Sequence, residues 1–352
     1  MRRSTLVFIF FGLIFATLVA ANYVATSQPP IILRVAVDPL VEAWVSRAAL
    51  AFNAQDTTIS GARVSISVVK QTEAEALAWT PTTRHDGWIA ASRLFEPSFN
   101  PSQPFRPLAE SLAETVLVWG GWQEYVQAIT QDGLTFDWQA VQAAAKVETW
   151  ERFGMSALRG NVFLGLPPAS TSSGYAALLS AAASYSQLDN VRRDVVGSVA
   201  FSEWFAPLKL AVGRPNVSLI STLATQGAKR INFALLTEAE WLTNLNAFQD
   251  KLVYAYPAYN VRLDFPFYIW DDANTTPTQR DSLRAFADFL RREEQQRLLA
   301  TYGLRRPGGQ ADASDATFRQ GQAYGFSAEL PRMTFISTPD RTTADSVIRL
   351  LN

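Results

Sequence analysis

The residues best suited to chemistry gather in one segment, 161–174, which reads NVFLGLPPASTSSG. An apolar, strand-like run ends at two prolines, and four hydroxyl-bearing residues follow: Ser170, Thr171, Ser172 and Ser173. A glycine and an alanine- and leucine-rich helical run come next. The hydroxyls and the free N–H groups at the start of such a helix meet at one point, where the helix dipole is positive. The segment therefore predicts a cradle that binds part of a small ligand.

The same pattern has a purely structural interpretation. Ser170 or Thr171 would then accept hydrogen bonds from the first N–H groups of the helix, and nothing would bind there. The sequence leaves both interpretations open.

A catalytic role is disfavoured on two counts. Ser172 stands between a strand and a helix, as in a G-x-S-x-G elbow, but the first glycine is missing and the only histidine, His85, precedes the serine. The serine therefore lacks a base to activate it. A glycosidase pair made of Asp38 and Glu238 has no supporting local motif. We expect no enzymatic activity.

The elements before this segment alternate between strand and helix. Strands are predicted at 31–37, 63–69 and 87–91, with helices at 41–52 and 73–79 between them. This order favours a parallel sheet with ligand chemistry at the carboxyl ends of its strands. Asp38 and Ser92 stand at two such ends, although Asp38 could instead cap the next helix and Ser92 could belong to a turn.

A second alternating unit follows. Its predicted elements are a strand at 115–120, a helix at 138–145, the cradle strand and helix at 161–185, a helix near 202–212, a strand at 231–235, a helix at 237–244 and a strand at 252–256. An extended segment at 264–269 and one long helix at 278–302, closed by Gly303, come next. The tail from Pro307 is expected to wrap irregularly.

This pattern predicts an α/β protein of two lobes joined by two hinge strands. Residues 31–114 and 258–352 are assigned to lobe I, and residues 115–257 to lobe II. Each lobe is expected to hold a mostly parallel sheet flanked by helices. A ligand would bind in the cleft between the lobes, and hinge closure would be the associated motion.

The N-terminal segment, 1–30, predicts export. Arg2 and Arg3 precede an apolar run at 6–21, and Val19-Ala20-Ala21 is a plausible cleavage site. The run also approaches the length of a membrane span. A cleaved signal peptide and a retained anchor that contacts the membrane both remain open, and either would place the rest of the chain outside the cytoplasm.

Composition excludes several classes of function. The net charge of −1 gives no electrostatic reason to bind nucleic acid. The absence of cysteine excludes disulfides and thiolate sites, and a single histidine excludes a multi-histidine metal site. We expect no cofactor and no metal. His85 is expected in a solvated loop, and Arg305 is expected to interact with a helix end and solvent.

A series of motifs resembles a known family in order and spacing: DGWIAASRLF, TWERF, GNVFLGLPPASTSSGYAALL, FALLTEAEWL, VYAYP, DFPFYIW and FADFLRREEQQRLLATYGLRRP. Over about residues 32–335 the chain resembles a bacterial extracellular solute-binding protein of the type II periplasmic-binding-protein fold. It is most similar to the molybdate-like binding proteins and their relatives found beside, or fused to, von Willebrand factor A domains.

The resemblance implies that a small molecule is captured between the lobes, for an ABC-type importer with a membrane permease. It places ligand contacts at Asp38, at Ser92 and at 170–173, with Glu238 and Tyr256 as further lining residues. The chain departs from oxyanion binders of this fold, because Asp38 and Glu238 would repel an anion. A neutral or cationic solute is therefore favoured. A membrane-anchored ligand sensor, or an interaction module with a surface-protein partner and no transporter, is the alternative.

Overall fold

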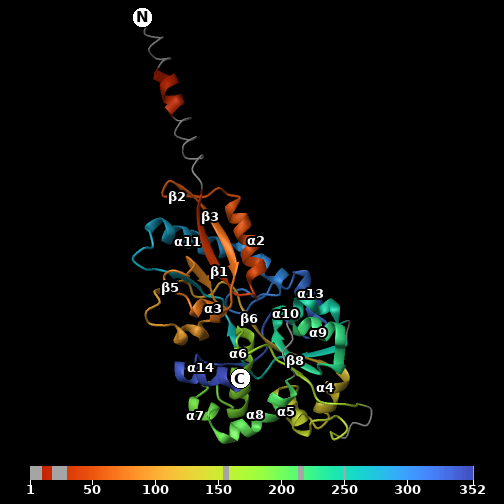
Figure 1. Cartoon of the computed structure of the whole chain (residues 1–352). Helices are drawn as coiled ribbons and strands as arrows, with labels where there is room; N and C mark the ends of the chain where they lie inside the picture. The colour runs from red at the N-terminus through yellow and green to blue at the C-terminus, as the bar shows by residue number, and fades with distance from the viewer. Residues whose placement is uncertain (1–9, 18–29, 154–157, 213–217, 249–250, 352) are drawn as a thin grey trace, which may run out of the picture.

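The computed structural model describes residues 10–17, 30–153, 158–212, 218–248 and 251–351. Two large sheets organise the described part of the chain. Strands β1 and β3 with helix α2 lie in the upper part of Figure 1, and helices α5, α7 and α8 lie in the lower part. Helix α6 stands between the two groups. This arrangement matches the predicted two-lobe α/β organisation.

The first sheet has six strands in the order β2-β3-β1-β4-β12-β5. Their bounds are β1 (Ile31–Val37), β2 (Thr58–Ile59), β3 (Ala62–Lys70), β4 (Gly87–Ile89), β5 (Phe105–Ala109) and β12 (Phe267–Trp270). Strand β1 runs parallel to β3 and to β4, whereas β12 is antiparallel to both of its neighbours. The carboxyl ends of the three parallel strands therefore meet at one edge, as the strand–helix alternation predicted.

Helices pack on the faces of this sheet. They are α2 (Glu42–Asn53), α3 (Glu73–Leu77), the 3-10 helix η1 (Arg93–Ser98) and α11 (Pro277–Leu290). Phe52 of α2 packs edge-on against Phe286 and Phe289 of α11, with ring centres 5.4 and 5.5 Å apart. His85, expected in a solvated loop, is instead buried with its ring edge-on to Trp79. Apolar packing of the ring explains the difference.

The second sheet has the order β11-β6-β8-β7, and β9 also pairs with β6. Its strands are β6 (Thr115–Trp122), β7 (Leu164–Gly165), β8 (Phe233–Thr237), β9 (Leu252–Ala255) and β11 (Arg262–Leu263). Strands β7 and β8 are parallel, whereas β6 is antiparallel to β8, β9 and β11. Both sheets are therefore mixed, and the prediction that each sheet is mostly parallel is wrong. The reason is that the strands that carry the chain from one sheet to the other run antiparallel to their neighbours.

The helices around the second sheet are α4 (Gln123–Thr130), α5 (Trp138–Val147), α6 (Ser172–Ser186), α7 (Arg193–Val196), α8 (Val199–Ala211), α9 (Leu219–Gln226), η2 (Gly227–Lys229), α10 (Glu238–Asn244) and η3 (Leu245–Ala247). Helix α6 is buried from Ser172 to Ser184. Its alanine-rich sequence explains this position, since small side chains let α5, β6 and α14 approach from several sides.

The single helix predicted at 278–302 is wrong. The chain forms α11, then α12 (Glu293–Leu298) and the 3-10 helix η4 (Leu299–Tyr302), because Arg292 takes an extended conformation. The break orients Gln296, whose side-chain amide donates to the carbonyls of Leu112 and Leu290. Gly303 ends the segment in the left-handed conformation, as predicted.

The C-terminal tail is more ordered than predicted. It contains α13 (Ala316–Gln322), α14 (Arg341–Ile348) and η5 (Arg349–Leu351), and β13 (Thr334–Phe335) pairs with β10 (Tyr259–Asn260). Helix α13 packs on α10, and α14 packs on α6, α7 and η1. The assignment of 258–352 to lobe I stays a prediction, but these contacts and β11 join that segment to elements of the second sheet as well.

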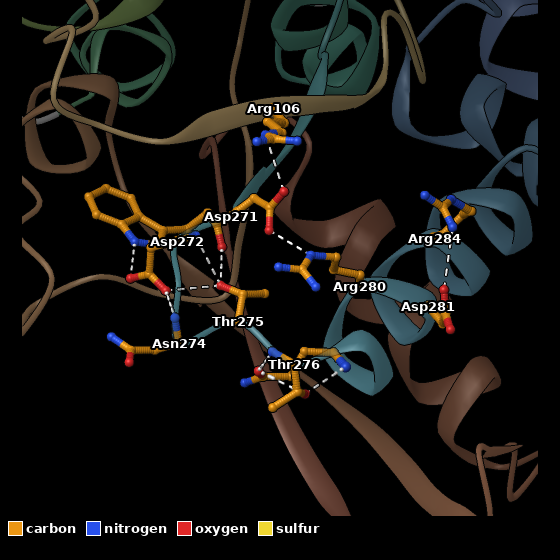
Figure 2. A network of polar contacts seen from close by, with 11 residues as sticks. Arg106, Asp271, Asp272, Asn274, Thr275, Thr276, Arg280, Asp281 and Arg284 are labelled. Carbon is orange, nitrogen blue, oxygen red and sulfur yellow. Dashed lines mark hydrogen bonds and ion pairs between the residues drawn. The ribbon is translucent and has the colours of Figure 1, made fainter.

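The corner between β12 and α11 is held by polar contacts, which Figure 2 shows. Asp271 pairs with Arg106 of β5 and with Arg280 of α11, at 3.2 and 2.6 Å. Asp272 accepts from the indole of Trp270 and from the backbone N–H of Asn274. Thr276 then caps α11. The acids of the turn therefore attach the helix to the edge strand.

Most of the expected signal or anchor segment, 1–30, lies outside the described residues. Within that segment, residues 10–17 are described and are helical. Within the described part of the chain, no helix has both the length and the apolar character needed to span a membrane.

A buried asparagine, Asn260 of β10, joins that strand to β6. The Asn260 side chain accepts from the N–H of Leu117 at 2.9 Å and donates to the carbonyl of Leu117 at 2.8 Å.

We expect Asn260→Ala to lower the free energy of unfolding by about 2 kcal/mol or more, because both buried backbone groups of Leu117 lose their partner. Urea denaturation followed by tryptophan fluorescence measures this. Asn274→Ala, at an exposed turn, is the control and should change stability by less than about 0.5 kcal/mol; equal effects would contradict the assigned role.

Candidate ligand-binding site

A cleft of about 280 Å³ lies where strand ends of the two sheets face each other. One wall follows β1 and β3, and the other follows β7 and β8. Its lining residues are Asp38, Pro39, Leu40, Thr72, Glu73, Pro167, Pro168, Thr171, Ser172, Ser173, Ser218, Leu219, Ile220, Leu236 and Glu240. Of the predicted ligand residues, the structure brings together Asp38, Thr171, Ser172 and Ser173 here.

The start of α6 forms one wall of this cleft. The Thr171 hydroxyl accepts from the N–H of Gly174 at 3.1 Å, so Thr171 is the N-cap. Gly174 is needed for close packing, because a Cβ at this position would lie 2.0 Å from the backbone oxygen of Pro168. The capping interpretation and the cradle interpretation therefore apply to different residues: Thr171 caps the helix and leaves the Ser172 hydroxyl free to reach across the cleft.

The opposite wall presents two carboxyl groups to that hydroxyl. The Ser172 Oγ lies 2.9 Å from Asp38 Oδ2 and also hydrogen-bonds Glu73 Oε2. The remaining oxygens are satisfied by backbone groups, since Leu40 N–H donates to Asp38 Oδ1 and Ala91 N–H donates to Glu73 Oε1, at 2.8 and 2.7 Å. Asp38, Glu73 and Ser172 are 2, 2 and 3% exposed. A direct polar contact thus joins the two sides of the cleft.

The electrostatics of the cleft are acidic. Burial, followed by the neighbouring Glu73, raises the pKa of the Asp38 carboxyl well above its usual value. Burial also raises the pKa of Glu240, whose carboxylate accepts from the N–H and hydroxyl of Thr237. Among the residues that the structure describes, the cleft lining includes no arginine, lysine or histidine. The carboxyl oxygens of the cleft can therefore accept hydrogen bonds or, when ionised, hold positive charge.

Two further predicted contacts lie outside this cleft. Ser92 is buried, and its hydroxyl accepts from Leu94 N–H and donates to the Arg262 carbonyl, so it caps η1. Ser170 is exposed in the turn before α6. The structure therefore gives Ser92 the turn role that the sequence left open, and neither residue lines the cleft.

Glu238 and Tyr256, predicted to line the cleft, belong instead to a buried ion-pair network. The Arg305 guanidinium donates to both oxygens of Glu238, at 2.5 and 2.7 Å, and the Tyr256 hydroxyl donates to Glu238 as well. Arg305, expected at a solvated helix end, is fully buried and also donates to the carbonyls of Gly309, Ser327 and Ala328. A buried charge requires such partners, which explains both corrections.

Sequence reasoning missed Glu73 and Glu240. Glu73 opens α3 just after the carboxyl end of β3, and β3 lies beside β1. The sequence rule that pointed to Asp38, a polar residue after a parallel strand, would also have found Glu73. Glu240 follows Thr237 at the spacing of a capping box, and the structure contains that box. Its place on the cleft wall depends on how α10 packs.

A larger hollow of about 540 Å³ lies on the first lobe around Arg106, Arg280 and Arg284. Each of these arginines is ion-paired with an aspartate: Asp271 serves the first two and Asp281 serves the third (Figure 2). The positive charge is thus locally balanced, and the hollow is less suited to an anion than three arginines suggest.

The chain matches no family model, and no curated protein matches it. Solved structures are similar in fold. An ABC transporter structure from Clostridium perfringens ATCC 13124 is 14% identical, with 91% of this chain and 100% of that chain covered and a TM-score of 0.60. The periplasmic binding protein AfuA from Actinobacillus pleuropneumoniae, with exogenous fructose-6-phosphate bound, is 14% identical over 91% and 96% of the two chains, with a TM-score of 0.56.

A third similar structure is that of a two-component system protein that mediates signal transduction. It is 13% identical, covers 92% of this chain and 100% of that chain, and has a TM-score of 0.58. These likenesses establish the fold of this chain as the two-lobe fold of periplasmic binding proteins.

The raised pKa of Asp38 has a consequence for stability. In the unfolded chain this carboxyl ionises near its ordinary pKa, whereas the folded chain retains the proton to higher pH. The unfolded state therefore binds fewer protons above that pKa, and the free energy of unfolding falls as the pH rises. We expect Asp38→Asn to be more stable than the unsubstituted protein at pH 8 and to lose this advantage towards pH 4. Urea denaturation at several pH values measures the difference, and parallel pH profiles would contradict the prediction.

The Glu238–Arg305 pair makes a separate prediction. Glu238→Gln should lower the free energy of unfolding by about 3–5 kcal/mol, because it leaves the buried guanidinium without a countercharge. Glu293→Gln is the matched control: Glu293 is half exposed, pairs with Arg306, and should matter far less. Chemical denaturation of both variants decides the point, and similar losses would refute a special role for the buried pair.

Proposed function

We propose that this protein is an extracytoplasmic solute-binding protein that captures a small molecule between its lobes and has no catalytic activity. The observation that carries the proposal is the position of the cleft. Residues that follow strands of both sheets line it, so closure of the lobes would enclose a ligand and opening would release it. The likeness to binding proteins of this fold supports the same function.

We propose an ABC-type importer with a membrane permease as the partner, by analogy with the ABC transporter structure that shares the fold. The N-terminal segment, with Arg2 and Arg3 before an apolar run, would act as an export signal or as a tether. Both alternatives place the cleft outside the cytoplasm, where such a protein would meet its solute.

The proposed solute is neutral or cationic. Three carboxyl groups line the cleft, from Asp38, Glu73 and Glu240, and the described part of the lining has no basic side chain. A similar structure carries a phosphorylated sugar, so the fold itself does not exclude anions. The acids are what disfavour them here. The sequence resemblance to molybdate-like and von Willebrand factor A-associated binding proteins is retained as a proposed relationship and does not extend to the ligand.

The second candidate function is a membrane-anchored sensor or interaction module without a transporter. The two-component system protein that mediates signal transduction has the same fold, and this likeness supports the candidate. In both functions a solute would bind in the same cleft. They differ in what recognises the closed form: a permease in one case and a signalling or surface protein in the other.

Solute binding is tested by thermal unfolding of the full chain, read by tryptophan fluorescence, against sugars, amino acids, polyamines, sulfate, phosphate and molybdate. A ligand at about 100 times its dissociation constant adds roughly 2.7 kcal/mol to stability and raises the melting temperature by a few degrees. We expect a shift with a neutral or cationic compound. Ser172→Ala should reduce that shift, whereas Ser186→Ala, at the far end of the same helix, should not. A shift with an oxyanion alone would overturn the charge preference, and the absence of any shift would count against solute binding.

A further inference from the structure

The contact of Ser172 with Asp38 and Glu73, across the cleft, requires a proton on one of the two carboxyl groups. A serine hydroxyl has one hydrogen to donate, yet the Ser172 Oγ is within hydrogen-bonding distance of carboxyl oxygens from both Asp38 and Glu73. The hydroxyl can donate to only one of them at a time. The other contact would place two oxygen lone pairs against each other unless that carboxyl carries a proton and donates to the serine. The closed arrangement is therefore complete only when the carboxyl pair holds one proton.

The groups that the structure describes around this contact offer no substitute for that proton. The second oxygens of Asp38 and Glu73 are already occupied by the N–H groups of Leu40 and Ala91. The third carboxyl on the cleft wall, Glu240 of α10, is held by Thr237 and adds no positive charge. The N-cap and first turn of α6 at the cleft, 171–174, carry no charged side chain. Lys70 at the end of β3 is exposed and does not line the cleft.

We propose that Ser172, Asp38 and Glu73 form a proton-dependent latch, in which closure of the lobes over the cleft is coupled to the uptake of one proton by the carboxyl pair. The latch adds a regulatory step to the proposed function and rests on the lobe opening that this function assumes. Burial and the neighbouring Glu73 raise the pKa of Asp38, which agrees with a proton held in the closed form.

The sign of the effect follows from linkage. When the lobes open, the Asp38 carboxyl meets water and its pKa returns towards the ordinary range, so the open form binds fewer protons. Low pH therefore favours the closed form, and a rise in pH favours opening. For one proton, the ratio of closed to open protein falls by up to tenfold for each pH unit above the pKa of the open form.

The latch is tested without any solute, by single-molecule fluorescence transfer on the full chain between pH 4.5 and 9. The chain has no cysteine, so Arg47→Cys on α2 and Glu203→Cys on α8 give two exposed and unique labelling positions. In the protein with both acids intact, we expect the closed fraction to fall as the pH rises, with a slope that approaches one proton.

Glu73→Gln should abolish this pH dependence. Its amide can donate to Ser172 while its oxygen keeps the bond from Ala91, so the closed contact forms without an added proton. Glu75→Gln is the matched control: it carries the same substitution on the same helix, but at an exposed capping residue, and should follow the unsubstituted protein. Asp38→Asn provides a second test of the same kind, should Glu73→Gln not fold.

The outcomes separate the latch from the proposed function. The latch is overturned if the closed fraction of the unsubstituted protein does not depend on pH. It is also overturned if Glu73→Gln and Asp38→Asn keep the pH dependence of the unsubstituted protein, or if Glu75→Gln loses it. A protein that gives a thermal shift with a solute but shows no pH-dependent opening would refute the latch alone. If opening depends on pH but no compound shifts the melting temperature, the result would support the latch and contradict solute binding.

Discussion

The contact of one serine hydroxyl with two buried carboxyl groups is the interaction on which the site depends. It joins the start of α6 to the ends of β1 and β3, and it places two acids where the described lining of the cleft has no positive side chain. Burial of such a pair is unfavourable unless a proton, a cation or hydrogen-bond donors compensate it. This requirement shapes both the class of solute that we propose and the conditions under which the lobes close.

Two other buried polar features maintain the arrangement around that contact. Asn260 joins the segment after β9 to β6, where the chain crosses between the sheets. Arg305 joins α10, through Glu238, to the carbonyls of the C-terminal segment. Asn260 is neutral, and Glu238 has Arg305 as its countercharge. The Asp38 and Glu73 pair has hydrogen-bond partners but no basic side chain among the described lining residues of the cleft. The distinction explains why Glu238 serves structure and Asp38 is a candidate for ligand binding.

The local elements could be predicted well because their signals are local. Strand β1 was predicted with its observed bounds, and β3, α5, α6, α8 and α10 were predicted within a few residues, since apolar periodicity and capping residues act over one or two turns. The prediction of one long helix at 278–302 was wrong because the buried Gln296 hydrogen-bonds Leu112, which is about 180 residues away along the chain. No local pattern contains such a contact.

The sequence by itself determined the strand–helix alternation, the two-lobe organisation, and the position of Asp38 and the hydroxyl cluster at element ends. Only the tertiary structure decided which of these residues meet. It brought Ser172 to Asp38, added Glu73 beside them, placed Ser92 in a turn, and paired Glu238 with Arg305. The physical reason is that a carboxylate has the same local sequence signature in a cleft as in an ion pair. Its role depends on the charge and donors that packing brings within about 4 Å of it.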